Sequence, residues 1–172
     1  NGKLPGLSTG ISGLDTLIGG LQDSRYVVIG ARPSDGKSAL AVNMLCHIGL
    51  HERVSVGLIS AESSNNEIVS RVFASEGSIN GSYLSMGLLS TRDMSALKAV
   101  GESIKDAPVY IYDAPNVRFA ELRSVARQMV ASFKVKVIFV DYIQILQWDD
   151  KRIPRHEQVA NISMGLKALA RE

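Results

Sequence analysis

The sequence predicts an α/β fold with a mostly parallel sheet flanked by helices. Short apolar runs rich in β-branched residues alternate with longer stretches whose apolar residues recur at helical spacing. The last run, residues 137–140, has four consecutive apolar residues, which is typical of a strand buried on both faces of a parallel sheet. Two runs lead into acidic residues, so carboxylates are expected at the carboxyl edge of the sheet, where ligands bind in such folds.

The composition is that of an ordinary globular domain. The chain has 172 residues, which is about the length of one domain, and it can bury a hydrophobic core. Its residues are 45% hydrophobic and 21% charged, as is usual for a globular protein. No run is long enough to span a membrane, and no secretory signal opens the chain. The single Cys46 predicts a packing role in a reducing, cytoplasmic protein. The net charge of +2 restricts any nucleic-acid binding to a local patch. Because the first residue is Asn1 rather than Met, we expect a piece of a longer protein.

The N-terminal third predicts a loop, a strand and a helix. Residues 4–20, rich in Gly, Ser and Thr, indicate a loop with a short helix and a turn, without chemistry of its own. Residues 26–30 predict the first strand, and a helix follows the next tight loop. The apolar face of that helix comprises Leu40, Ala41, Met44, Leu45 and Ile48. Strand, tight loop and helix are the context that a phosphate-binding loop needs.

The predicted phosphate loop comprises Ala31, Arg32, Pro33, Ser34, Asp35, Gly36, Lys37 and Ser38. Its backbone N–H groups and the positive end of the following helix would hold phosphate oxygens. Gly36 lets the backbone approach the phosphates, Lys37 can reach the β- and γ-phosphates, and the Ser38 hydroxyl can bind Mg²⁺. The alternative is a chance Gly-Lys-Ser in a turn, which the flanking strand and helix disfavour.

A second buried strand is predicted over residues 54–60, and it leads into Glu62. At the carboxyl edge of the sheet, this carboxylate is placed to polarise the water that attacks the γ-phosphate. The alternative is a carboxylate that favours the N-terminus of the helix predicted over residues 65–76. The phosphate loop upstream favours the catalytic role.

The middle of the chain continues the alternation. Helices are predicted over residues 65–76, 91–104 and 119–133, a strand over 109–112, and a loop with a short helical piece over 78–90. The predicted inward residues of the three helices are Ile68, Val69, Val72 and Phe73; Met94, Leu97 and Val100; and Leu122, Val125, Ala126, Met129 and Val130. Asp113, at a strand end, is a candidate to support the site or to cap the turn before Pro115.

The strand predicted over residues 137–141 ends in Asp141, whose carboxylate can hold Mg²⁺ beside Ser38. A charged segment follows, in which Lys151, Arg152 and Arg155 are candidates to grip DNA phosphates. The alternative for this segment is a solvated loop. Trp148 could stack on a base or anchor the loop in the core. The last helix is predicted over residues 157–172.

These motifs together resemble the C-terminal motor domain of the DnaB-type replicative DNA helicases. The resemblance rests on Ala-Arg-Pro-Ser-x-Gly-Lys-Ser at 31–38, Ser-Ala-Glu at 60–62, Val-Asp-Tyr-Ile-Gln at 140–144 and the segment 166–172. It implies a RecA-like P-loop core within a homo-hexameric ring that hydrolyses ATP with Mg²⁺ at subunit interfaces and moves along single-stranded DNA. It also implies primase and a helicase loader as partners. By position, Lys37 and Ser38 would contact phosphate and Mg²⁺, Glu62 would be catalytic, and Asp141 would hold the metal.

The sequence departs from the family pattern in places. Asp35 adds a negative charge to the phosphate loop, and Ala61 stands where Leu is usual. The sensor and the arginine finger of the family would follow residue 172, so we expect residues 1–172 to be an incomplete motor domain. Two alternatives remain open: another RecA-like ATPase of the recombination or clock type, and a nucleotide-binding interaction module that does not hydrolyse ATP.

Overall fold

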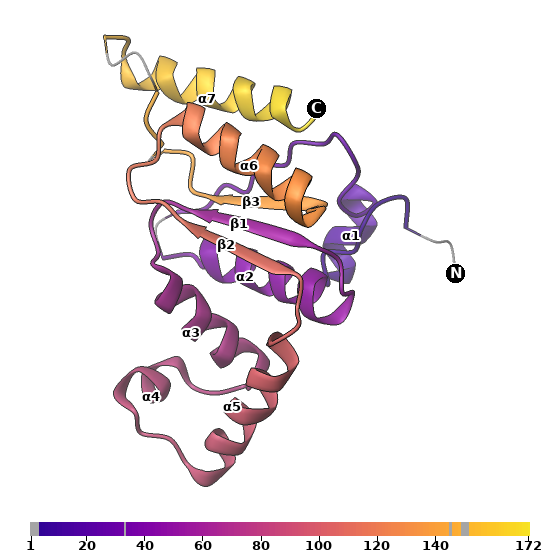
Figure 1. Cartoon of the computed structure of the whole chain (residues 1–172), viewed down its shortest axis with the longest axis vertical. Coiled ribbons are helices and arrows are strands. Elements are labelled where there is room, and N and C mark those ends of the chain that lie inside the picture. Colours follow the sequence, from indigo (N-terminus) through magenta and orange to yellow (C-terminus); the bar gives the residue numbers. More distant parts are fainter. Residues whose placement is uncertain (1–3, 33, 145, 149–151) are drawn as a thin grey trace.

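A computed structural model, which describes residues 4–32, 34–144, 146–148 and 152–172, contains a three-stranded parallel sheet (Figure 1). The strands are β1 (Val56–Ser60), β2 (Val109–Asp113) and β3 (Val137–Asp141), in the spatial order β2-β1-β3. Ser60 pairs with the last residue of each neighbouring strand. All three carboxyl ends therefore meet at one edge, as the sequence predicts.

Seven α-helices occur in the described part of the chain: α1 (Ser12–Ile18), α2 (Lys37–Cys46), α3 (Asn65–Glu76), α4 (Gly81–Met86), α5 (Thr91–Ile104), α6 (Phe119–Phe133) and α7 (Arg155–Leu169). A π-helical turn, η1 (His47–His51), continues α2. The predicted bounds of α3, α5 and α6 are confirmed, as is a short helix between residues 78 and 90. No helix of the described residues is long and apolar enough to cross a membrane.

Alternation along the strands divides the core into two layers. On β1, Val56 and Leu58 face one layer and Ile59 faces the other, as expected for side chains with a period of two. The first layer contains buried residues of α2, η1 and α3, and the second contains those of α6 and α7. Figure 1 shows these helices on opposite faces of the sheet. Cys46 lies in the first layer, where burial raises the pKa of its thiol to about 12; its predicted packing role is confirmed.

The predicted first strand is wrong. Residues 26–30 form no strand, and Val27 and Val28 are 50% and 61% exposed. These residues and β3 line the same open cavity, of about 1850 Å³. A parallel strand forms only where its backbone lies about 4.8 Å from a neighbouring strand and hydrogen-bonds to it. Apolar β-branched residues alone therefore do not make residues 26–30 a strand.

Three predicted inward residues are also misplaced. Val69 of α3, Met94 of α5 and Val130 of α6 are exposed, whereas Ile68, Val100 and Met129 on the same helices are buried. Each helix packs on the core along a narrow stripe, and the exposed residues lie at its margin.

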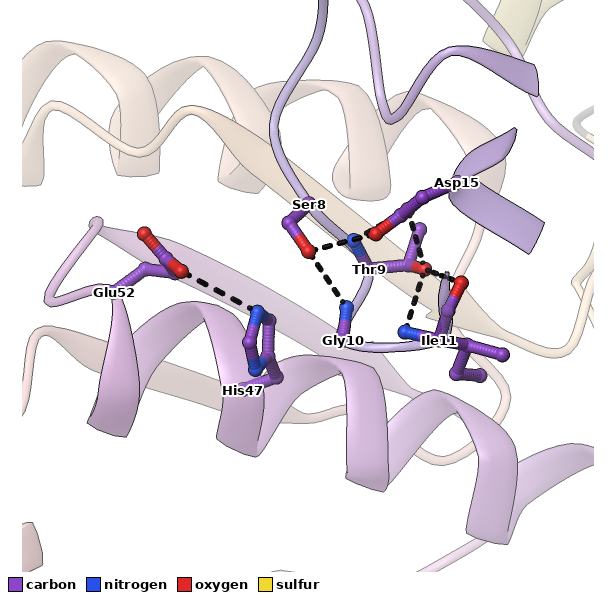
Figure 2. A network of polar contacts seen from close by, with 7 residues as sticks. All are labelled: Ser8, Thr9, Gly10, Ile11, Asp15, His47 and Glu52. Carbon is purple, nitrogen blue, oxygen red and sulfur yellow. Dashed lines mark hydrogen bonds and ion pairs between the residues drawn. The ribbon is translucent and has the colours of Figure 1, made fainter. Parts of the chain in front are cut away.

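A polar network fixes the shape of the N-terminal segment, residues 4–20, by joining residues 8–15 to one another (Figure 2). The buried carboxylate of Asp15 accepts hydrogen bonds from the Ser8 hydroxyl (2.7 Å) and from the Thr9 N–H and hydroxyl (2.9 and 2.7 Å). Burial raises the pKa of Asp15, but these bonds outweigh it and lower the pKa overall. The His47 ring lies against Gly10, where a Cβ would come within 2.6 Å of it. The loop is therefore fixed at the junction of α2 and η1.

We predict that Gly165→Ala destabilises the protein by about 1–3 kcal/mol, because added volume in a packed core forces its neighbours to move. A Cβ at Gly165, on α7, would overlap the ring of Phe119 on α6. The matched control is Gly13→Ala on α1, where a Cβ meets nothing within 4 Å. Chemical denaturation measures both variants. Equal stability of the two would contradict the tight packing of α7 on α6.

Candidate nucleotide-binding site

The predicted phosphate loop leads directly into α2. Ser34 and Gly36 adopt positive φ angles of 68° and 87°, and α2 begins at Lys37. The first N–H groups of a helix lack partners within it, and they carry the positive end of the helix dipole. Loop residues Arg32, Ser34 and Gly36 line the open cavity beside β3. The loop thus presents the start of a helix to a space that can accept an anion. Pro33 lies outside the described residues.

Asp141 brings the phosphate loop and the end of β3 together. One carboxylate oxygen lies 2.6 Å from Lys37 Nζ, and the other accepts a hydrogen bond of 2.6 Å from the Ser38 hydroxyl. Asp141 is only 8% exposed, so its charge needs a partner of this kind. Lys37 and Ser38 precede Asp141 by about a hundred positions along the chain, yet both contact its carboxylate directly. The sequence predicted that these three residues act together.

Glu62 lies at the same edge. Its carboxylate is 3.8 Å from Lys37 Nζ, and its side chain is 50% exposed. The backbone N–H of Ala61 donates to the carbonyl of Asp141 at 2.8 Å, which holds the end of β1 beside that of β3. Ser64 and Glu67, rather than Glu62, form the capping box of α3, and the alternative that the Glu62 charge favours the N-terminus of this helix stays open.

Tyr142 is a site residue that the sequence reasoning missed. Lys37 Nζ lies 3.7 Å from the centre of its ring, within the range of a cation–π interaction. The only signal in the sequence was an aromatic residue directly after Asp141.

Asp113 does not cap the turn before Pro115. Its carboxylate accepts a hydrogen bond of 3.1 Å from the backbone N–H of Asn65, at the start of α3.

Of the predicted DNA-contacting residues, Arg155 is the first residue of α7. The Arg155 guanidinium donates to the carbonyls of Gln144 and Leu146, the latter at 2.9 Å, and to the Gln158 side chain at 2.8 Å. Arg155 therefore holds the segment after β3 to the start of α7, and its contact with DNA stays a prediction. Arg152 is exposed and also stays a candidate, and Lys151 lies outside the described residues.

Trp148 packs into the core. Its ring stacks on Phe119, with the ring centres 5.4 Å apart. Phe119 N–H donates to the carbonyl of Gln147 at 2.9 Å, and Leu146 is fully buried. Of the two roles that the sequence allowed, the structure supports the anchoring of the loop.

The chain matches a known protein family along almost its whole length. The family described as DnaB-like helicase C terminal domain matches residues 6–172. The chain belongs to this family. It is 42% identical over 169 residues to the replicative DNA helicase DnaB of Treponema pallidum, covering 98% of this chain and 39% of that protein. It is 34% identical to DnaB of Geobacillus stearothermophilus, covering 100% and 38%. The chain thus spans less than half the length of these relatives.

Solved structures confirm the predicted RecA-like fold class of this DnaB-like domain. One solved ATPase domain matches with a TM-score of 0.90 and 28% identity, over 99% of this chain and 61% of that one. A DnaB-like replicative helicase, solved to show its interactions with primase, matches with a TM-score of 0.87 and 28% identity, over 99% and 41%.

We predict that single-stranded DNA leaves the fluorescence of Trp148 nearly unchanged, because its ring is already stacked on Phe119. Trp148 is the only tryptophan in the sequence, so the emission of this chain reports this site alone. Titration with oligothymidylate provides the measurement, and Phe119→Leu provides a control that should shift the emission to the red. Strong quenching by DNA would instead assign Trp148 to base stacking.

Proposed function

We propose that this chain is the motor domain of an ATP-driven replicative DNA helicase. The observation that carries the proposal is the convergence of Lys37, Ser38 and Asp141 at the start of α2, with Glu62 nearby. This arrangement supplies the parts that phosphoryl transfer needs: a cradle for phosphates, metal ligands and a carboxylate that can orient water. Family membership and the likeness to an ATPase domain support the same reading.

The donor set fits ATP with Mg²⁺. Ser38 and Asp141 present two oxygen atoms 2.6 Å apart, and oxygen ligands are those that Mg²⁺ prefers. No cluster of three or more His, Cys, Asp or Glu side chains that could hold a metal exists among the described residues. A magnesium ion at a nucleotide site is usually held by one or two protein groups together with phosphates and water. When bound, the ion would neutralise charge on the phosphates.

Lys37 must exchange partners for the site to bind nucleotide. Its ammonium is paired with Asp141 and lies over Tyr142, whereas a phosphate-loop lysine has to reach the β- and γ-phosphates. Glu62 is accessible to water because half of its side chain is exposed, and its carboxylate can accept a proton or orient a water molecule. A module that only binds nucleotide would not need this carboxylate. Membership of the DnaB-like family disfavours a recombination or clock ATPase.

We further propose a larger assembly for this motor. The chain covers 39% of the length of the Treponema relative, so residues 1–172 would form part of a longer cytoplasmic protein that assembles as a homo-hexamer on single-stranded DNA. Primase is a proposed partner because the matched DnaB-like replicative helicase is described together with its interactions with primase. A helicase loader is proposed from the family resemblance alone.

The nucleotide site is tested with Lys37→Ala and Glu62→Gln in the full-length protein. Lys37→Ala should abolish ATP turnover because the phosphates lose their main positive charge. Glu62→Gln should retain nucleotide binding and lower turnover by about 10²–10⁴-fold, since an amide cannot act as a base. Turnover and binding of a fluorescent ATP analogue are measured side by side.

The matched control is Glu102→Gln on α5, an exposed carboxylate outside the cavity lined by the phosphate loop. Turnover of Lys37→Ala close to that of the wild type would remove the phosphate-loop assignment. Normal turnover of Glu62→Gln would leave the phosphate loop in place and require another water-activating group.

The DNA contacts are tested by replacing Lys151 and Arg152 together with Ala. Affinity for single-stranded DNA should fall, and the salt dependence of log K should flatten by roughly 0.7 per lost phosphate contact. Arg155→Ala is measured separately, because this residue also holds the carbonyls of Gln144 and Leu146. Arg92→Ala with Lys98→Ala on α5 is the charge-matched control. An unchanged salt slope in the Lys151 and Arg152 variant would favour the solvated-loop alternative.

A further inference from the structure

The position of Glu62 depends on the backbone that carries it. Its carboxylate is half exposed, and the 3.8 Å to Lys37 Nζ is longer than a hydrogen bond. Because its own contacts are weak, the position of the Glu62 carboxylate depends on the conformation of the turn between β1 and α3. The groups that fix this turn therefore decide where the carboxylate can act.

Ser60 closes the turn from the strand side. Its hydroxyl donates to the Ser63 carbonyl at 2.6 Å and accepts from the Ser63 N–H at 3.1 Å. Ser60 is 1% exposed and Ser63 is also buried, so both bonds are shielded from water. Ala61 and Glu62 are the two residues enclosed between these bonded positions.

Asp113 fixes the turn from the helix side. It is the last residue of β2, and its carboxylate accepts a hydrogen bond of 3.1 Å from Asn65 N–H, the first residue of α3. The capping box satisfies the N–H groups of Ser64 and Glu67 but not that of Asn65, and Asp113 accepts the hydrogen bond of this remaining N–H group. A negative charge at this helix end is also favourable. Asp113 thus links the end of β2 to the segment that carries Glu62.

We propose that Asp113, with Ser60, is a positioning residue that holds Glu62 at the nucleotide site. This inference rests on the proposed catalytic role of Glu62. Small displacements of a reacting group are costly, and about 1 Å can lower a rate by about 10²-fold. The structure offers a control for simple helix capping. Ser90 and Asp93 form a capping box on α5, with the same chemistry but outside the cavity lined by the phosphate loop.

The experiment uses the full-length protein with Asp113→Ala, Asp113→Asn and Ser90→Ala. Asp113→Ala should lower kcat for ATP hydrolysis by about 10- to 100-fold with KM changed by less than about two-fold, since the phosphate loop is untouched. Asp113→Asn should recover most of kcat, because its amide oxygen still accepts the hydrogen bond. Ser90→Ala should lower the melting temperature while leaving kcat unchanged.

A double variant links the effect to Glu62. In the Glu62→Gln background, Asp113→Ala should lower kcat no further, as expected for two residues that act through one group. If Asp113→Ala does not fold, Ser60→Ala replaces it, with the same expected loss of kcat at unchanged KM.

A kcat within about two-fold of wild type for a folded Asp113→Ala or Ser60→Ala variant would overturn the inference and leave a plain helix cap. Additive losses with Glu62→Gln would also overturn it. Failure of the proposed function looks different: Glu62→Gln itself would then turn over normally.

Discussion

The site depends on the contacts that the buried carboxylate of Asp141 makes with Lys37 and Ser38. A carboxylate that is only 8% exposed needs partners, and these are the ammonium of Lys37 and the hydroxyl of Ser38. The pairing joins the last residue of β3 to the first turn of α2, two elements far apart in the sequence. The fold itself thus brings together the three groups that are proposed to bind phosphate and metal.

The parallel sheet makes this arrangement possible. Because Ser60, Asp113 and Asp141 are paired at one register, the residues that follow them are delivered to the same edge. The three positions differ in what they hold. Asp141 binds the phosphate loop, Ser60 closes the turn that carries Glu62, and Asp113 caps α3. The proposed nucleotide site and its supporting bonds therefore follow from strand register together with three short side chains.

The sequence predicted most elements because their local patterns agree with their environment. The bounds of α3, α5 and α6 follow from helical periodicity and, for α3 and α5, from capping boxes. Residues 26–30 failed as a strand because ladder bonds need a neighbour, and a sequence pattern cannot supply one. Val69 and Val130 failed because the width of a buried helix face depends on what packs against it.

By itself, the sequence determined the phosphate loop, the two carboxylates at strand ends and the alternation of helix and strand. These features are local: they depend on residue type, spacing and the period of each element. Only the tertiary structure decided that Tyr142 lies under Lys37 and that Arg155 binds backbone carbonyls. It also decided that Asp113, at the end of β2, bonds the first residue of α3, the helix that follows β1. The contacts of Tyr142 and Asp113 join residues that are far apart along the chain, so their spacing in the sequence does not predict that they meet. The order and register of the strands bring these residues together.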